Sequence, residues 1–107
     1  MTFARPKRGP LVSAKARDNA RGQNCTLRLS CCTMDPAQTV LAHLRVFGWA
    51  GMAQKPPDYL AVFACHNCHA EIDRRADEAE WGYDDLLRAL GETLMRQFAD
   101  GIYGVKE

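Results

Sequence analysis

The chain lacks any hydrophobic run that approaches the ~20 consecutive apolar residues a membrane-spanning helix requires. Residues 1–24 include basic residues but no apolar stretch after them, so they do not have the pattern of a secretory signal. Internal repeats and low-complexity tracts are missing as well. These absences exclude a membrane-embedded or secreted protein and predict a cytoplasmic one. At 107 residues, 47% of them hydrophobic, the chain is long enough for one small domain and too short for two.

The chain contains five cysteines, so it lacks the even number that a complete set of disulfides would need. An odd count argues against a closed set of disulfides. In the reducing cytoplasm, clustered thiols hold metal more often than they form disulfides. The cysteines are therefore predicted to bind a metal ion.

The formal net charge is only +1, but it hides a strong asymmetry along the chain. Residues 1–28 contain seven basic residues and one acidic residue, whereas residues 71–107 contain ten acidic and five basic residues. A basic arm beside a neutral centre and an acidic end indicates a polyanionic partner that approaches from one side. The alternative is a basic tail that is merely solvated.

The first predicted elements are a short helix and an extended segment. Ser13 suits the N-cap of a helix over residues 14–20, which Gly22 would end. This helix is too short to be stable alone and must dock on the rest of the domain. Polar residues alternate with leucine over residues 25–32, which predicts a short extended segment that ends in a turn at Asp35.

Two strands separated by a loop are predicted next, over residues 40–46 and 59–64. The apolar face of the first strand would consist of Val40, Ala42, Leu44 and Val46. Since side chains alternate along a strand, His43 and Arg45 would project together from the opposite face. Glycines and a Pro-Pro pair predict a loop over residues 47–58.

The second half of the chain is predicted to be helical, first over residues 66–76 and again after Gly82. Asp84 and Asp85 suit the first turn of the later, amphipathic helix. The apolar stripe predicted to pack on the core consists of Tyr83, Leu87, Leu90, Leu94 and Phe98. Together these elements predict a small α+β domain.

Cys65 and Cys68 have the spacing of one half of a four-ligand zinc site. The other half would be Cys25 with either Cys31 or Cys32, which spacing alone does not distinguish. Such a site would staple a domain whose strands are too short to support themselves. The neighbouring histidine at position 66 is interpreted as a helix-start residue rather than a ligand.

His69 and Asp73 follow the second thiol and are four residues apart. On a helix, side chains at i and i+4 lie on the same face. An imidazole and a carboxylate placed in this way can hold a second divalent ion and leave coordination positions open, as a catalytic ion requires. The alternative is a surface His–Asp hydrogen bond that stabilises the helix.

The order of these parts is a thiol pair, a strand with a histidine, a loop, a strand, and Cys-x-x-Cys-His opening a helix. This order resembles the zinc-stabilised HNH (ββα-metal, or His-Me finger) nucleases over residues 25–76. More narrowly, VLAHLR at 40–45, KPPD at 55–58 and ACHNCHAEID at 64–73 are similar to a small family of prophage-encoded proteins regarded as nucleases. In that family the second thiol stands eleven residues before the strand histidine, which favours Cys32 over Cys31.

The resemblance implies a zinc-stapled ββα-metal core at residues 25–76. A basic arm with a short helix, residues 1–24, would precede it, and residues 77–107 would add a C-terminal helix that packs on the core. Arg5, Lys7, Arg8 and Arg45 are the candidate DNA-binding residues.

The resemblance also implies a role for each matching residue. His43 stands at the position of the general base, and imidazole exchanges protons near neutral pH. Asp58 stands at the position of the motif's central Asn, where it would orient that imidazole or itself reach the ion. His69 matches the last motif His, a ligand of the catalytic ion, and Asp73 adds a second ligand. Arg45, on the same strand face as His43, is the candidate phosphate clamp.

The implied activity is hydrolysis of phosphodiester bonds in DNA by an endonuclease that uses Mg²⁺, Mn²⁺ or Zn²⁺. Two positions depart from the HNH pattern: Ala42 stands where many members have a metal-binding Asp or His, and Asp58 replaces the central Asn. These departures and the charge asymmetry motivate a second hypothesis, a non-catalytic zinc-stabilised nucleic-acid-binding accessory module of phage origin. A third is a protein-interaction domain with Trp49 at its surface. No feature of the sequence predicts an oligomeric state.

Overall fold

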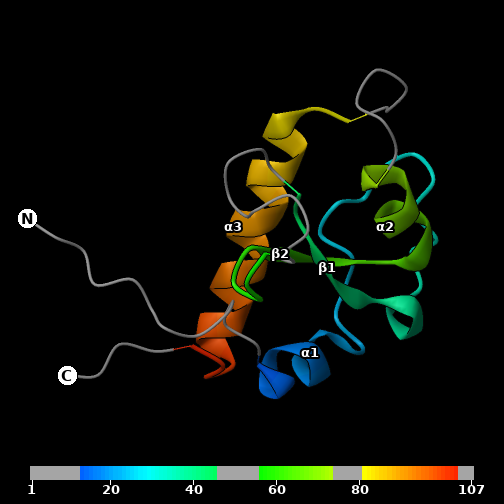
Figure 1. The fold of residues 1–107 in the computed structure, drawn as a ribbon. Coiled ribbons are helices and arrows are strands. Elements are labelled where there is room, and N and C mark those ends of the chain that lie inside the picture. The colour runs from blue at the N-terminus through cyan, green and yellow to red at the C-terminus, as the bar shows by residue number, and fades with distance from the viewer. Residues whose placement is uncertain (1–12, 46–55, 74–80, 104–107) are drawn as a thin grey trace, which may run out of the picture.

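The computed structural model describes residues 13–45, 56–73 and 81–103. Within these ranges, the elements follow one another along the chain in the order α1 (Ala14–Ala20), the 3₁₀ helix η1 (Pro36–Gln38), β1 (Val40–His43), β2 (Ala61–Ala64), α2 (His66–Ile72) and α3 (Tyr83–Ala99) (Figure 1). The two strands form one antiparallel sheet, which confirms the α+β class. No helix in the described ranges has the length and apolar character needed to cross a membrane. Most of the predicted 47–58 loop lies outside them.

The hairpin at the centre of the fold consists of β1 (Val40–His43) and β2 (Ala61–Ala64). Ala42 is fully buried and His43 half-buried, as the predicted alternation requires. Val40 was expected in the core but is 44% exposed, because at the start of the strand it lines an open cleft instead. Val46 lies outside the described residues.

The outer edge of β2 is covered by groups from distant parts of the chain. The Phe63 carbonyl accepts the Thr26 backbone N–H at 2.8 Å, and the Phe63 N–H donates to the Thr93 hydroxyl at 3.1 Å. These bonds satisfy polar groups that an edge strand would otherwise leave unpaired. They also attach the N-terminal loop and α3 to the hairpin.

The helix α3 (Tyr83–Ala99) forms as predicted, with acidic residues in its first turn. The prediction of its buried face is confirmed only in part: Leu90 packs against the core, but Tyr83, Leu87 and Phe98 are 68%, 73% and 50% exposed. The buried residues are Leu86, Ala89, Thr93 and Gln97. The helix turns this face inward because the Thr93 hydroxyl bonds the β2 edge and the small Ala89 allows close approach. Several of the larger apolar side chains of the helix, Tyr83, Leu87 and Phe98, are thereby left exposed.

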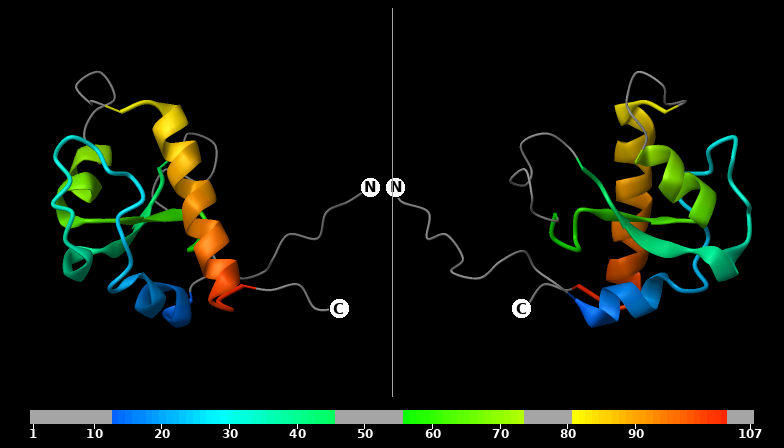
Figure 2. Two further views of the ribbon diagram at one scale, coloured as in Figure 1. Left: turned by 180° about the vertical axis from the view of Figure 1, so that it is seen from behind. Right: turned by 45° about the vertical axis from the view of Figure 1, so that its right-hand side comes forward.

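The helix α1 (Ala14–Ala20) also forms as predicted. The Ser13 side chain accepts an N–H from its first turn, and Gly22 follows it with a φ of +82°. Figure 2 shows α1 lying at the C-terminal end of α3, where the Asn19 amide donates to Asp100 at 2.9 Å. This docking supplies the support that so short a helix needs.

Residues 25–32, predicted to be extended, form a loop instead of a strand. Arg28 has a φ of +48°, in the left-handed region, which interrupts the extended backbone. The Arg88 guanidinium on α3 donates to the Thr26 carbonyl at 2.7 Å, and Arg28 pairs with Glu92 at 3.0 Å. The loop is thus held on α3, with Cys25 at its start. The turn predicted at residue 35 is present as the N-cap of η1 (Pro36–Gln38).

Candidate metal centre and candidate active-site cleft

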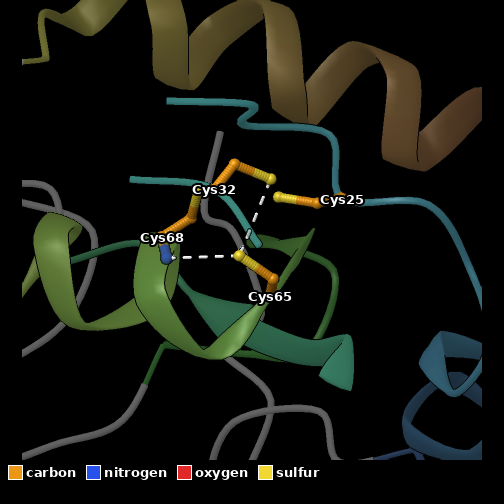
Figure 3. Close-up of side chains that lie close together, drawn as sticks. All are labelled: Cys25, Cys32, Cys65 and Cys68. Carbon is orange, nitrogen blue, oxygen red and sulfur yellow. Dashed lines mark hydrogen bonds between the residues drawn. The ribbon is translucent and has the colours of Figure 1, made fainter. Parts of the chain in front are cut away.

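Four cysteine side chains converge where α2 (His66–Ile72) begins. Cys65 caps this helix and Cys68 lies in its first turn, while Cys25 and Cys32 come from the loop before β1 (Figure 3). All four sulfur atoms lie within 4.8 Å of one another, and those of Cys65 and Cys32 are 3.7 Å apart. A tetrahedron with metal–sulfur bonds of about 2.3 Å has edges of about 3.8 Å. The four thiols are therefore positioned to bind a metal ion.

The four thiols are not electrostatically equivalent. Burial opposes ionisation of Cys65, but hydrogen bonds from Cys68 and Thr33 outweigh it and lower the pKa of this thiol to about 6. Burial raises the pKa of Cys68, and the nearby Cys25 raises it further. Burial also raises the pKa of Cys32. A bound divalent cation would offset these opposing effects, because it stabilises every thiolate that coordinates it.

Cys31, which spacing left as an alternative ligand, lies outside this cluster. Its thiol donates to the Asn67 carbonyl at 3.6 Å, and the Asn67 amide donates back to the Cys31 carbonyl at 3.0 Å. This reciprocal pair holds the cysteine loop against α2. Cys32 is the residue that the structure places with the other three thiols.

A cleft of about 460 Å³ opens beside the hairpin and brings four other predicted site residues together. His43 and Arg45 line it from the end of β1, and His69 and Asp73 line it from α2 and its C-cap. The described residues that line the cleft are Arg17, Arg21, Val40, Leu41, His43, Arg45, His69 and Asp73. Residues that the sequence places on a strand and on a helix thus face one space.

His43 is held by a buried carboxylate. Its Nε2 lies 2.6 Å from Asp58 Oδ1, while Asp58 Oδ2 accepts the Ser13 backbone N–H at 2.6 Å. Burial opposes the charge on Asp58, but the Ser13 N–H, His43 and Arg17 outweigh it and lower the pKa of this carboxyl. An ionised carboxylate accepts the proton of Nε2, so in neutral His43 the lone pair is on Nδ1. Asp58 therefore orients the imidazole and leaves Nδ1 as its basic atom.

His69 and Asp73 form a second pair on the same cleft. His69 Nε2 lies 3.6 Å from Asp73 Oδ2, and the Arg45 guanidinium lies 3.9 Å from Asp73 Oδ1. Two donor atoms 3.6 Å apart can both reach an ion at about 2.1 Å. In the described part of the chain, only the four cysteines form a group of three or more potential metal ligands. Within those residues, the His69–Asp73 pair therefore has no third protein ligand beside it.

Sequence reasoning missed Arg17 and Arg21, which carry two guanidinium groups into the cleft from α1 and its C-cap. Arg17 also lies 3.4 Å from Asp58. A signal was available, because Arg17 lies in the last turn of the helix predicted over residues 14–20 and Arg21 follows directly after that helix. The predicted DNA-binding residues Arg5, Lys7 and Arg8 lie outside the described residues, as does Trp49.

Known proteins are similar in sequence to this chain over most of its length. A family model described as "Putative nuclease YbcO" matches residues 14–99. A curated protein of that name from Escherichia coli K12 is 45% identical over 92 residues, covering 83% of this chain and 96% of the relative. The relative from Enterobacteria phage 82 has the same identity and coverage. A solved structure titled "Structure of a putative bacteriophage protein", from Escherichia coli K-12 MG1655, is 34% identical with a TM-score of 0.64, covering 81% of this chain and 100% of that one.

Proposed function

Because the chain belongs to the "Putative nuclease YbcO" family, we propose that it is a metal-dependent HNH-type endonuclease that hydrolyses phosphodiester bonds in DNA. The observation that carries this proposal is the His43–Asp58 pair, in which a buried carboxylate holds an imidazole that lines an open cleft. This is the arrangement of a general base with its orienting group.

In the proposed reaction, His43 Nδ1 takes a proton from the water that attacks the phosphorus atom. The negative charge of Asp58 stabilises the imidazolium that forms. Asp58 does not take the other role open to it, that of metal ligand, because both of its oxygens are engaged within the protein and only 1% of the residue is exposed.

The substrate phosphates would be held by arginines around the cleft. Arg45 approaches from the end of β1, and Arg17 and Arg21 approach from α1. A guanidinium group presents a planar fork of donors that suits phosphate oxygens. Three such groups on one cleft favour a polyanionic strand over a neutral substrate.

His69 and Asp73 would hold the catalytic ion, for which Mg²⁺, Mn²⁺ and Zn²⁺ are the candidates. When bound, such an ion stabilises negative charge on the scissile phosphate and on the leaving oxygen. With only two protein ligands, most coordination positions remain for water and phosphate oxygens, and weak binding in the absence of DNA is expected. The Arg45 guanidinium near Asp73 also favours weak binding of the ion, because the guanidinium and the metal ion would compete for one carboxylate.

In this proposal the ion at Cys25, Cys32, Cys65 and Cys68 is a structural zinc, since a closed set of four thiolates is typical of structural zinc sites. Residues 25–76 form the catalytic core. Residues 1–24 form a basic arm in which Arg5, Lys7 and Arg8 contact DNA, and residues 77–107 contain the supporting helix.

Nicking of supercoiled plasmid in the presence of each candidate ion tests the proposal. Wild type should nick, His43→Ala should not, and His66→Ala should retain activity. His66 is a matched control because it is an exposed histidine that does not line the cleft. Equal rates for wild type and His43→Ala with every ion would refute the catalytic role.

One observation favours a second function, a non-catalytic zinc-stabilised module that binds nucleic acid. Ala42 offers no ligand beside His43, and the His69–Asp73 pair has no third ligand among the described residues. This alternative expects steeply salt-dependent DNA binding that His43→Ala leaves unchanged, with no nicking by any variant.

A further inference from the structure

A second cavity, of about 240 Å³, adjoins the cleft that contains His43. Arg45 and Asp73 line both cavities, so these two side chains form the wall between them. Because Asp73 is the C-cap of α2, the proposed ligand pair and the second cavity share one helix end. A group bound in the second cavity would therefore lie directly beside whatever occupies the first.

The second cavity has an apolar floor and aromatic walls. Leu44 and Leu86 form part of the floor and are only 2% and 6% exposed. The Trp81 indole N–H donates to the Glu71 carbonyl at 3.1 Å, which ties this ring to the last turn of α2. Tyr83 stands edge-on to it, with ring centroids 6.1 Å apart and planes inclined at 71°. The two rings form an aromatic corner in which Tyr83 is largely exposed.

We propose that this aromatic pocket receives one unpaired nucleobase of the strand whose phosphate lies in the adjacent cleft. The substrate class is then single-stranded or locally unpaired DNA, with a base extruded beside the bond to be cut. This inference rests on the proposed nuclease function and specifies its substrate.

Size and chemistry favour a base over other occupants. A cavity of about 240 Å³ lies below the ~300–1,000 Å³ typical of sites for larger ligands, so it suits a single ring system. Aromatic side chains stack on the faces of all bases and supply much of the affinity in single-strand binding.

Continuity with the basic cleft is the second argument. The guanidinium groups of Arg17, Arg21 and Arg45 line the first cavity, where they attract phosphates. A base is attached to the sugar next to each phosphate, so a strand held by these arginines delivers a base to the aromatic pocket. A free apolar ligand would gain nothing from the positive charge alongside.

Binding of two single-stranded oligomers of equal phosphate number tests the inference, one of thymidines and one entirely abasic. The protein is the full-length His43→Ala variant, in which cleavage does not interfere. It should bind the thymidine oligomer more tightly than the abasic one. Adding Tyr83→Ala should weaken thymidine binding by about 5- to 150-fold, the effect of losing one stacked base, and leave abasic binding unchanged.

Two further variants control for structure. Tyr83→Phe keeps the ring and should retain the preference. Phe98→Ala removes another exposed aromatic side chain, from the far end of α3, and should also retain it. Trp49→Phe leaves Trp81 as the chain's remaining tryptophan, whose fluorescence the thymidine oligomer should quench and the abasic oligomer should not.

Equal binding of the two oligomers, or a Tyr83→Ala loss that is the same for both, would overturn the base pocket. Neither result depends on turnover. Nicking without a base preference would refute only the pocket, whereas a base preference without nicking would refute only the nuclease.

Discussion

Asp58→Asn preserves the shape of a buried side chain and removes its charge, and we predict a moderate loss of stability. The carboxylate accepts the Ser13 N–H and pairs with His43, each at 2.6 Å. Hydrogen bonds to charged groups contribute about 1.5–3 kcal/mol, against about 0.5–1.5 kcal/mol for neutral ones. Since an amide can keep both contacts in neutral form, the loss should be roughly 2 kcal/mol in total. Arg17, with 46% of its side chain exposed, is screened by water and adds little.

The pH dependence of this difference identifies its source. The pKa of Asp58 is lowered in the folded protein, so its contribution to stability is fully present above the ordinary carboxyl value of 3.8. That contribution is lost as the pH falls below 3.8 through the folded pKa. The gap in unfolding free energy between wild type and Asp58→Asn should therefore narrow in acid. Both proteins carry the same cysteine cluster, so the release in acid of a metal ion held there would affect them alike.

The predicted effect on activity is larger than the effect on stability. Asparagine would use its oxygen for the Ser13 N–H and its amide N–H for His43 Nε2. Nε2 must then accept, which moves the imidazole proton onto Nδ1, the atom that has to act as the base. The rate of cleavage should fall by about 10²–10⁴-fold, the range that a general base supplies.

Single-turnover plasmid cleavage measures this loss, and urea unfolding measures the change in stability. Glu92→Gln is the matched control. Burial opposes the charge on Glu92, but Arg28 and Arg88 outweigh it and lower the pKa of this carboxyl. Glu92 is not among the residues that line the cleft. Full activity in Asp58→Asn would contradict the tautomer reasoning. A loss of activity in Glu92→Gln equal to that in Asp58→Asn would show a general effect of charge.

Three further predictions concern the metal centre, the cleft and α3. Cys65→Ser should release the metal and leave the chain largely unfolded, whereas Cys31→Ser should retain both the metal and the fold. Elemental analysis measures the metal content and circular dichroism the fold. A Cys65→Ser protein that is folded but free of metal would contradict the claim that the metal holds the domain together. Arg21→Ala should reduce the slope of log affinity against log salt by about 0.7 in fluorescence anisotropy with single-stranded DNA, and an unchanged slope would remove Arg21 from the phosphate site. Leu86→Ala should lower the free energy of unfolding by about 2–5 kcal/mol and Leu87→Ala by less than about 0.5 kcal/mol, so equal losses would argue against the observed buried face.

Features that depend on neighbouring residues could be predicted from the sequence. The Ser13 cap, the pairing of Cys65 with Cys68 and the shared face of His43 and Arg45 each follow from spacing within one element. The resemblance to a prophage-encoded family regarded as nucleases added what spacing within this chain could not, the preference for Cys32 as the fourth thiol.

Features that depend on long-range contacts could not be predicted. Periodicity places a helix over α3 but does not say which face turns inward, and the deciding bond joins Thr93 to the edge of β2. The bond from Ser13 to Asp58 spans 45 residues, so nothing in the sequence couples α1 to the candidate general base. The left-handed backbone at Arg28, which prevents a strand, has no signal in its alternating pattern.

Cleavage and binding of the same DNA by wild type and His43→Ala, both with full metal content, test the central claim most directly. We predict that His43→Ala binds as tightly as wild type but cleaves at least about 100-fold more slowly, because the imidazole acts on the attacking water and not on the phosphates. Equal cleavage rates, or losses of binding and cleavage in the same proportion, would contradict the role of His43 as general base.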